Sequence, residues 1–418
     1  MQVVAVEQPY LHSSDVALFV RCGSRHELVS QWGLAHFVEH MLFRGSAKHP
    51  DSLTLARAME RAGSMLAAST YRDHTQFAAT VHPSRLKNFL GVLADMVAQP
   101  VFDGIDVERD IIEEELRGDF DAAGHDANIN NISRAHIWTD HPMGRRITGS
   151  VESLHAFNVD HVQAHHARHY VGSNAVLCVA GPLKARDVVA IAAEAFADMT
   201  RGSCTTDGEA AHFAASQRLL THRIDASQLS VQLTFEALPD PHDDFIALQF
   251  LTRILDDGIG SRLQQAVCEK RGLVYEMTTG LDCYADCGLY DIELKVQPRR
   301  ASTAIGATLD VLAKLCDDGV SENEIDDIRE RLLHELEYRV DSTTELANYF
   351  GTATLFGSAK ADESFCEEAA RIRSVSSEHV LLVARRLFNS GQFLATVVGP
   401  LERVNMKKIE QLVDSFGA

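Results

Sequence analysis

Residues 33–45 read GLAHFVEHMLFRG, an apolar helical pattern interrupted by His36, Glu39 and His40. In a helix, His36 and His40 lie one turn apart, so both imidazoles project from the same face and can share one ion. Glu39 lies beside them, close enough to take a proton from a metal-bound water without being a ligand itself. Because apolar residues surround these groups, a divalent cation would satisfy all of them at once. The stretch therefore predicts a buried metal site on a helix.

A hydrolytic zinc site needs a third protein ligand and an open position for water. Residues 107–116 read VERDIIEEEL and are typical of an amphipathic helix. Glu108 and Glu115 lie seven residues apart, two helical turns, and therefore on one face. Either carboxylate could reach the ion. Without the histidine motif, this acidic helix would predict only a solvated surface.

The order His-x-x-Glu-His is the inverzincin motif. With further segments that cover most of the chain, it resembles the pitrilysin-type (M16) zinc metallopeptidases, in particular the short branch similar to mitochondrial processing peptidase and the bacterial M16B peptidases. The matching segments are residues 23–27 (GSRHE), 33–45, Gly63, Thr70, Thr75, residues 100–102 (PVF), residues 108–112 (ERDII) with Glu115, residues 147–150 (ITGS) and residues 176–181 (VLCVAG).

The resemblance implies a role for each residue of the predicted site. In that family the third ligand is a glutamate about 75 positions after the second histidine, and here 115 − 40 = 75. His36, His40 and Glu115 are thereby implied as the ligands of Zn²⁺ and Glu39 as the base. Glu108 is implied as a supporting acidic residue of the catalytic group.

The strand that pairs with substrate commonly reads Asn-Ala-x-Thr in the family. This chain has Ala67, Ala68, Ser69 and Thr70 there, so Ala67 replaces the asparagine. We expect these four residues to bind an extended peptide through main-chain hydrogen bonds, which demand little of the peptide sequence. The substitution affects the details of substrate binding and leaves the metal prediction unchanged.

An internal repeat predicts the domain organisation. Residues 176–183 (VLCVAGPL) recur as residues 394–401 (LATVVGPL), and the two glycines are 399 − 181 = 218 positions apart, about half the chain. We predict an N-terminal half (1–200) with the zinc site, a linker (201–216), and a C-terminal half (217–418) without the metal motif. The expected fold class is α+β, each half being a mainly antiparallel sheet with helices packed on it. The resemblance implies that the halves form a clam-like cavity around a peptide.

Periodicity and turn signals predict the elements of the first half. Strands are expected at residues 3–6, 17–20, 65–69 and 75–81, with a polar turn at 12–15, and helices at 53–62, 86–97 and 107–116. In the second half, residues 244–255 form a helix without metal ligands where the first half has its motif. The Ser321-x-x-Glu324 pattern predicts a capping box that starts a long helix.

Composition limits the partners and the compartment. The formal net charge of −20 argues against nucleic acid and anionic membranes as partners. The chain has no apolar run of about 18 residues and no visible signal peptide, so we expect a cytoplasmic protein. Its eight cysteines form no disulfide framework and are expected to be reduced core thiols. The histidines at 161, 165, 166 and 169 could form a second metal-binding cluster, but we expect them at surface or packing positions.

These observations predict a zinc metalloendopeptidase that cuts peptides or processes a peptide precursor. Many family members place an Arg and a Tyr in the second half to stabilise the oxyanion, yet residues 287–300 offer Tyr290 where the Arg is expected and no clear following Tyr. We therefore expect a homodimer, or a heterodimer with a related M16 subunit that supplies the pair. The alternatives are a non-catalytic scaffold subunit, and a peptide-binding chaperone with structural zinc. The chaperone is disfavoured because no fourth ligand lies near in sequence.

Overall fold

The computed structural model describes residues 1–240, 242–389 and 391–417 of the chain. These residues form two compact units. Unit 1 comprises residues 1–117, 145–209 and 337–364. Unit 2 comprises residues 118–144, 210–336 and 365–418. Among the described residues, none of the helices combines the length and the apolar character that a bilayer span requires.

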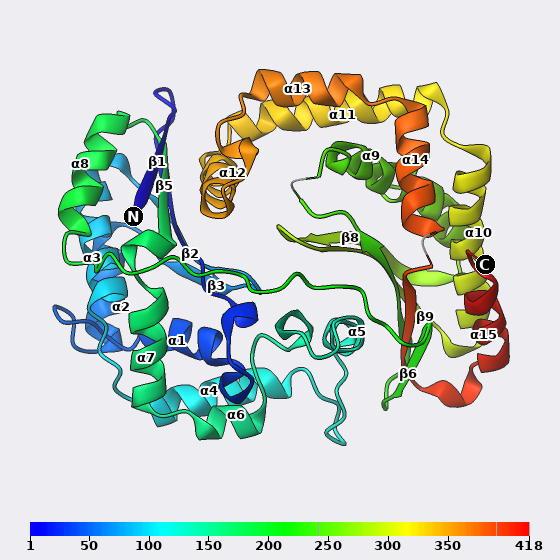
Figure 1. Ribbon diagram of the computed structural model, residues 1–418, viewed down its shortest axis with the longest axis horizontal. Coiled ribbons are helices and arrows are strands. Elements are labelled where there is room, and N and C mark those ends of the chain that lie inside the picture. The colour runs from blue at the N-terminus through cyan, green and yellow to red at the C-terminus, as the bar shows by residue number, and fades with distance from the viewer. Residues whose placement is uncertain (241, 390, 418) are drawn as a thin grey trace. The chain divides into compact units, whose positions relative to one another are not determined.

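Each unit contains a five-stranded mixed sheet, and the two sheets have the same topology (Figure 1). The strand order is β1-β5-β2-β4-β3 in unit 1 and β6-β10-β7-β9-β8 in unit 2. Only the first pair in each order is parallel; the other pairs are antiparallel. The strands of unit 1 are β1 (Gln2–Glu7), β2 (Ser14–Val20), β3 (Ala67–Thr70), β4 (Thr75–Val81) and β5 (Ala175–Gly181). Those of unit 2 are β6 (Leu219–Arg223), β7 (Leu229–Ala237), β8 (Val274–Cys283), β9 (Gly288–Val296) and β10 (Phe393–Gly399).

The duplicated topology confirms the predicted fold class, two homologous α+β halves with mainly antiparallel sheets. The repeat found in the sequence corresponds to β5 and β10, which occupy the same place in the two sheets. The predicted strand pair at residues 65–69 and 75–81 is confirmed as the antiparallel pair β3 and β4. The polar turn expected at residues 12–15 was partly wrong, because Ser14 and Asp15 already belong to β2. The clam-like cavity stays a prediction.

Helices cover both faces of the unit 1 sheet, which explains why every residue of β2 and β5 is buried. In Figure 1, α2, α3 and α8 lie together on one side of this sheet. The predicted helices at 53–62 and 86–97 are confirmed as α2 and α3. The helices of unit 1 are α1 (Leu34–Leu42), α2 (Ser52–Ala62), α3 (Leu86–Ala98), α4 (Ile105–Arg117), α6 (Val151–Ala156), α7 (Val159–His169), α8 (Ala185–Ala195) and α12 (Thr343–Phe356).

The helix α12 comes from the second half of the sequence but packs on β2 and β5 of unit 1. Asp15 of β2 accepts hydrogen bonds from the hydroxyls of Thr343 on α12 and of Thr80 on β4. Gly351 lies so close to the ring of Phe19 that a Cβ atom there would come within 2.2 Å of a ring carbon. A glycine is therefore required for α12 to approach the sheet this closely.

Unit 2 is built the same way, with α5 from the first half of the sequence packed on β7 and β10. Its helices are α5 (Ile129–Ile137), α9 (Phe245–Leu255), α10 (Ala301–Asp318), α11 (Glu322–Val340), α13 (Phe365–Ser374), α14 (Ser377–Phe388) and α15 (Met406–Ser415); the last residues of α11, from Glu337, count with unit 1. The predicted capping box is confirmed at the start of α11, where Ser321 and Glu324 exchange hydrogen bonds between side chains and backbone amides. The units thus differ from the sequence halves expected at 1–200 and 217–418, since segments 118–144 and 337–364 each pack with the sheet of the other half.

A buried ion-pair network attaches α5 to the unit 2 sheet. The guanidinium of Arg134 donates to the carboxylate of Asp291 and, at 3.3 Å, to Asp282. Asp291 also accepts from the hydroxyl of Thr234 at 2.7 Å. Only 4% of Arg134 and 6% of Asp291 are exposed. Because a buried charge is costly unless it is paired, this network fixes one arrangement of α5 on the sheet.

Candidate metal centre

The helix that carries the histidine motif, α1, is anchored at its start by a remote carboxylate. Gly33, at φ 92°, precedes the helix and has no side chain with which to cap it. Glu27 accepts hydrogen bonds from the backbone amides of Gly33 (2.8 Å) and Ala35 (2.7 Å) instead. Burial raises the pKa of Glu27 to about 8, and the two amide hydrogen bonds oppose this rise. The capped helix places His36 in its first turn.

The structure brings His36, His40 and Glu115 together at one point of unit 1. One ligand atom from each lies within 4.8 Å of the other two. Each histidine Nε2 lies 3.7 Å from an oxygen of Glu115, which projects from α4. The two imidazole rings are 4.6 Å apart, as expected for residues one helical turn apart. Burial and the neighbouring His40 lower the pKa of His36 to about 3, so this ring is neutral.

Glu108 takes a different position from Glu115. Its carboxylate lies 3.2 Å from Nδ1 of His40, on the opposite side of the ring from the nitrogen that faces Glu115. Arg44 donates to the same carboxylate at 3.3 Å. Burial lowers the pKa of His40, but the hydrogen bond to Glu108 and the nearby carboxylates outweigh it, and the pKa is raised overall. A proton on Nδ1 of His40 leaves Nε2 free to bind a metal.

Glu39 projects from α1 toward the edge strand β3. Its carboxylate accepts a hydrogen bond of 2.9 Å from the hydroxyl of Thr70. Burial raises the pKa of Glu39, while the hydrogen bond from Thr70 opposes the rise. The carboxylate is thereby held in one orientation beside the two histidines, and it is not one of the three grouped ligands.

A cavity of about 420 Å³ joins these groups. It is lined by His36, Glu39, His40, Ala68, Ser69, Thr70, Glu115, Ile147 and Thr148. Three of the four residues predicted to bind substrate therefore line it, and Ala67 does not. Since β3 is the last strand in the sheet order, its outer edge can accept an extended chain alongside the cavity.

The donor set fits a zinc ion. Two imidazoles and one carboxylate are a ligand set of catalytic zinc, with bonds of about 2.0–2.2 Å that would place the ligand atoms roughly 3.3–3.5 Å apart. The observed separations of 3.7 Å lie a few tenths of an ångström above this value. They also exceed hydrogen-bonding distance, so the three side chains face one another without bonding. Nδ1 of His36 is buried without a hydrogen-bond partner among the described residues.

Several supporting residues escaped the sequence analysis. Glu27 could have been suspected, because a helix that starts at a glycine needs a cap from elsewhere. Arg44 lies four residues after His40, but its contact with Glu108 depends on the packing of α4 against α1. Thr70 was predicted only as a substrate residue, and its hydrogen bond to Glu39 depends on the position of β3 beside α1.

We expect the Glu108→Gln variant to bind zinc about 10- to 100-fold more weakly, since Glu108 orients His40 and raises its basicity. An amide at this position keeps the shape but lacks the charge. Zinc affinity can be measured by competition with a chromogenic chelator. Glu114→Gln is the matched control, because Glu114 lies on the same helix with 69% of its side chain exposed. Equal affinities for the two variants would contradict a role of Glu108 in holding His40.

Comparison with known proteins identifies relatives across the whole chain. Residues 2–150 match the family model described as Insulinase (Peptidase family M16), and residues 156–332 match Peptidase M16 inactive domain. An uncharacterized zinc protease of Mycobacterium tuberculosis is 30% identical over 406 residues, covering 96% of this chain and 91% of that protein. The mitochondrial-processing peptidase subunit beta of Dictyostelium discoideum is 25% identical over 419 residues, covering 95% of this chain and 87% of that one. The crystal structure of a peptidase M16 inactive domain from Pseudomonas fluorescens has the same fold, with a TM-score of 0.86, 22% identity and 95% coverage of both chains.

Proposed function

Because the chain belongs to the M16 peptidase family, we propose that it is a zinc-dependent metalloendopeptidase that hydrolyses peptides or processes a peptide precursor. One observation carries the proposal. A single cavity in unit 1 joins the three zinc-type ligands, the carboxylate of Glu39 and the edge strand β3. These are the parts that metal-assisted hydrolysis of a peptide requires: a metal ligand set with an open position, a base and a place for the substrate backbone.

The residues of the cavity have different roles in the proposed reaction. His36, His40 and Glu115 would hold Zn²⁺, which when bound lowers the pKa of a coordinated water toward neutrality. Glu39 accepts a proton from the attacking water and delivers it to the leaving amine. Thr70 keeps Glu39 turned toward the cavity through its hydrogen bond. The outer edge of β3 would bind the substrate backbone, which gives affinity with little demand on sequence.

We further propose that a second M16 subunit, identical or related, supplies the groups that stabilise the oxyanion. Tyr290, which stands where the family resemblance expects the Arg, is fully buried in the core of unit 2 and has no access to a substrate. A relative of this chain, mitochondrial-processing peptidase subunit beta, is named as one subunit of an enzyme. We also propose that this chain acts in the cytoplasm.

The test is cleavage of a mixed peptide library by the purified chain, alone and mixed with a related M16 subunit from the same genome. We expect cleavage that a zinc chelator abolishes and added Zn²⁺ restores, because the ion supplies the activated water. Products are identified by mass spectrometry, and zinc is quantified in each sample. An activity per milligram of protein that rises with protein concentration or on mixing supports the partner. Full activity per milligram of the monomer at low concentration removes the need for it.

The competing proposal is a non-catalytic scaffold subunit, and one protein of the same fold is named as an inactive M16 domain. The present chain retains His36, Glu39, His40 and Glu115, which a scaffold has no reason to keep. Zinc bound in stoichiometric amount without cleavage by the chain, alone or mixed, would favour the scaffold and overturn the peptidase.

A further inference from the structure

A second group of metal-binding side chains lies inside unit 1 and takes no part in the proposed peptidase site. Cys22 lies two residues after the end of β2, and His165 and His169 lie one helical turn apart on α7. One ligand atom from each lies within 4.8 Å of the other two. All three are buried, with 0%, 6% and 2% of their surfaces exposed. None of them lines the cavity around His36 and His40.

The spacing of the two histidines in this group repeats that of the first one. The rings of His165 and His169 are 4.6 Å apart, the same separation as the rings of His36 and His40. Sγ of Cys22 and Nε2 of His165 share a hydrogen bond of 3.1 Å, which a bound ion would replace. Tetrahedral zinc, with Zn–S about 2.3 Å and Zn–N about 2.0–2.1 Å, places such atoms roughly 3.5 Å apart. Small movements of the side chains would therefore admit an ion.

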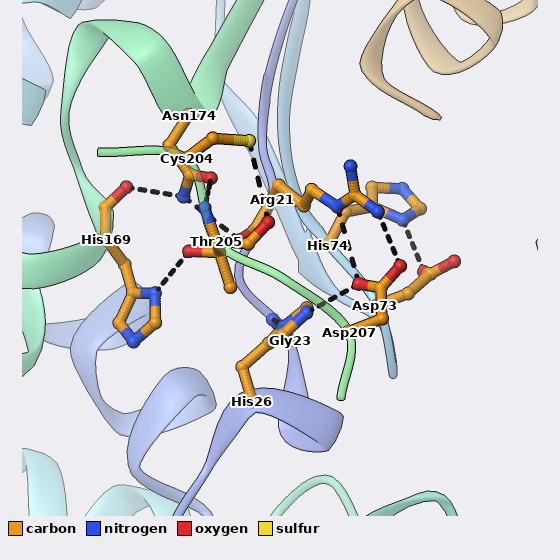
Figure 2. A network of polar contacts seen from close by, with 10 residues as sticks. All are labelled: Arg21, Gly23, His26, Asp73, His74, His169, Asn174, Cys204, Thr205 and Asp207. Carbon is orange, nitrogen blue, oxygen red and sulfur yellow. Dashed lines mark hydrogen bonds and ion pairs between the residues drawn. The ribbon is translucent and has the colours of Figure 1, made fainter. Parts of the chain in front are cut away.

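The surrounding contacts orient His169 as they would orient a metal ligand (Figure 2). Nδ1 of His169 lies 3.0 Å from the hydroxyl of Thr205, which leaves Nε2 available. The backbone amide of Thr205 donates to Asn174 at 2.9 Å, and Asn174 donates to the carbonyl of His169 at 2.8 Å. Hydrogen bonds of this kind to the second ring nitrogen fix the tautomer and direction of a ligating histidine.

His26 lies near this group but does not belong to it. Its ring is 6.3 Å from that of His169. Both nitrogens of His26 are engaged: Nδ1 accepts from the backbone amide of Gly23 at 3.1 Å, and Nε2 lies 2.9 Å from Asp207, which also pairs with Arg21 (Figure 2). Among the described residues, the group therefore offers three protein ligands.

We propose that Cys22, His165 and His169 bind a second transition-metal ion, Zn²⁺, which ties α7 to the end of β2. A thiolate and two imidazoles select zinc or another thiolate-seeking transition metal over Mg²⁺ or Ca²⁺. All three ligands are buried, so the ion would hold α7 against the segment after β2 and would not meet a substrate. The segment that begins at Cys22 leads to Glu27, whose carboxylate caps the helix of the first metal centre. Binding here stabilises the folded chain, because the unfolded chain has no preformed site.

Cobalt substitution distinguishes the two centres, because only the second contains sulfur. The metal-free full-length chain, kept reduced, is titrated with Co²⁺ while its absorption spectrum is recorded. We expect about two ions per chain and a thiolate-to-cobalt charge-transfer band. Glu115→Gln, which weakens the first centre, should keep the band. Uptake of one ion or fewer without such a band in the folded wild-type chain would overturn the proposal, and this measurement needs no variant.

Variants assign the band to Cys22. Cys22→Ser should abolish the band and reduce uptake to about one ion. Cys204→Ser is the control for a nearby cysteine. It should keep the charge-transfer band and the uptake of about two ions, because Cys204 is exposed and lies outside the group. Should Cys22→Ser fail to fold, as judged by circular dichroism, His169→Gln tests the same site and should weaken the band. A band that survives in a folded Cys22→Ser or His169→Gln chain would refute the assignment.

Discussion

The Glu39→Gln variant is expected to lower the turnover of a peptide substrate by about 10²- to 10⁴-fold, the contribution typical of a general base. Glutamine has the size of glutamate, and its amide oxygen can accept the hydrogen bond from Thr70, so the cavity keeps its shape. What is lost is the ability to take a proton from water. Zinc content should remain unchanged, because Glu39 is not one of the three proposed ligands.

The measurement pairs kcat on one cleaved peptide with zinc content by atomic absorption, at equal protein concentration. Glu114→Gln serves as the control, since it makes the same chemical change at an exposed position of unit 1. Turnover that survives in Glu39→Gln at full zinc occupancy would mean that another group is the base. Loss of zinc together with turnover would instead assign Glu39 to the ligands.

The Arg134→Met variant is expected to reduce the free energy of unfolding of unit 2 by about 3–5 kcal/mol, as is usual when one partner of a buried ion pair is removed. Methionine replaces the aliphatic stem of Arg134, and only the guanidinium is lost. The cost arises because Asp291, only 6% exposed, is left as a buried charge without its guanidinium partner. This makes the change one of the largest available from a single side chain outside the metal centre.

Urea unfolding followed by circular dichroism measures this effect. Arg223→Met is the control in the same unit, where the side chain is 74% exposed and its ion pair with Glu402 contributes little. The double variant Arg134→Met with Asp291→Leu should recover part of the loss, because it removes the unpaired charge along with its partner. An Arg134→Met variant as stable as Arg223→Met would show that the buried network does not hold α5.

Local periodicity accounts for the parts of the fold that were predicted. The strands at 65–69 and 75–81 and the helices at 53–62 and 86–97 follow from alternation and helical spacing within short windows, and their boundaries shifted by one or two residues at most. The repeat of residues 176–183 at 394–401 predicted the duplication, since equivalent strands carry equivalent apolar runs. The exchange of α5 and α12 between the sheets was missed. No local pattern records which of two similar sheets a helix will cover.

The predicted site also combines features that follow from local spacing with features that depend on packing. The spacing of His36, Glu39 and His40 is a property of one helix, so the sequence by itself determined that these groups share a face. Glu108 and Glu115 share a face of their own helix as well, and helical spacing therefore left both open as ligands. Only the packing of α4 against α1 places Glu115 opposite Nε2 of His40 and Glu108 at its Nδ1.

Apart from the pairing of Glu115 with the histidines, which the family resemblance implies, contacts between distant segments were not predicted from the sequence. Cys22 and His165 are 143 positions apart, and only the packed structure brings their side chains to 3.1 Å. Glu27 reaches the start of α1 through a loop whose course depends on the surrounding core. The elements, the duplication and the histidine motif could be predicted from the sequence, because each depends on short-range periodicity or on direct repetition. Only the packed structure reveals which nitrogen of His40 each carboxylate faces, which sheet each exchanged helix covers and which thiol meets which imidazoles, because those outcomes depend on side chains packed from segments far apart in the chain.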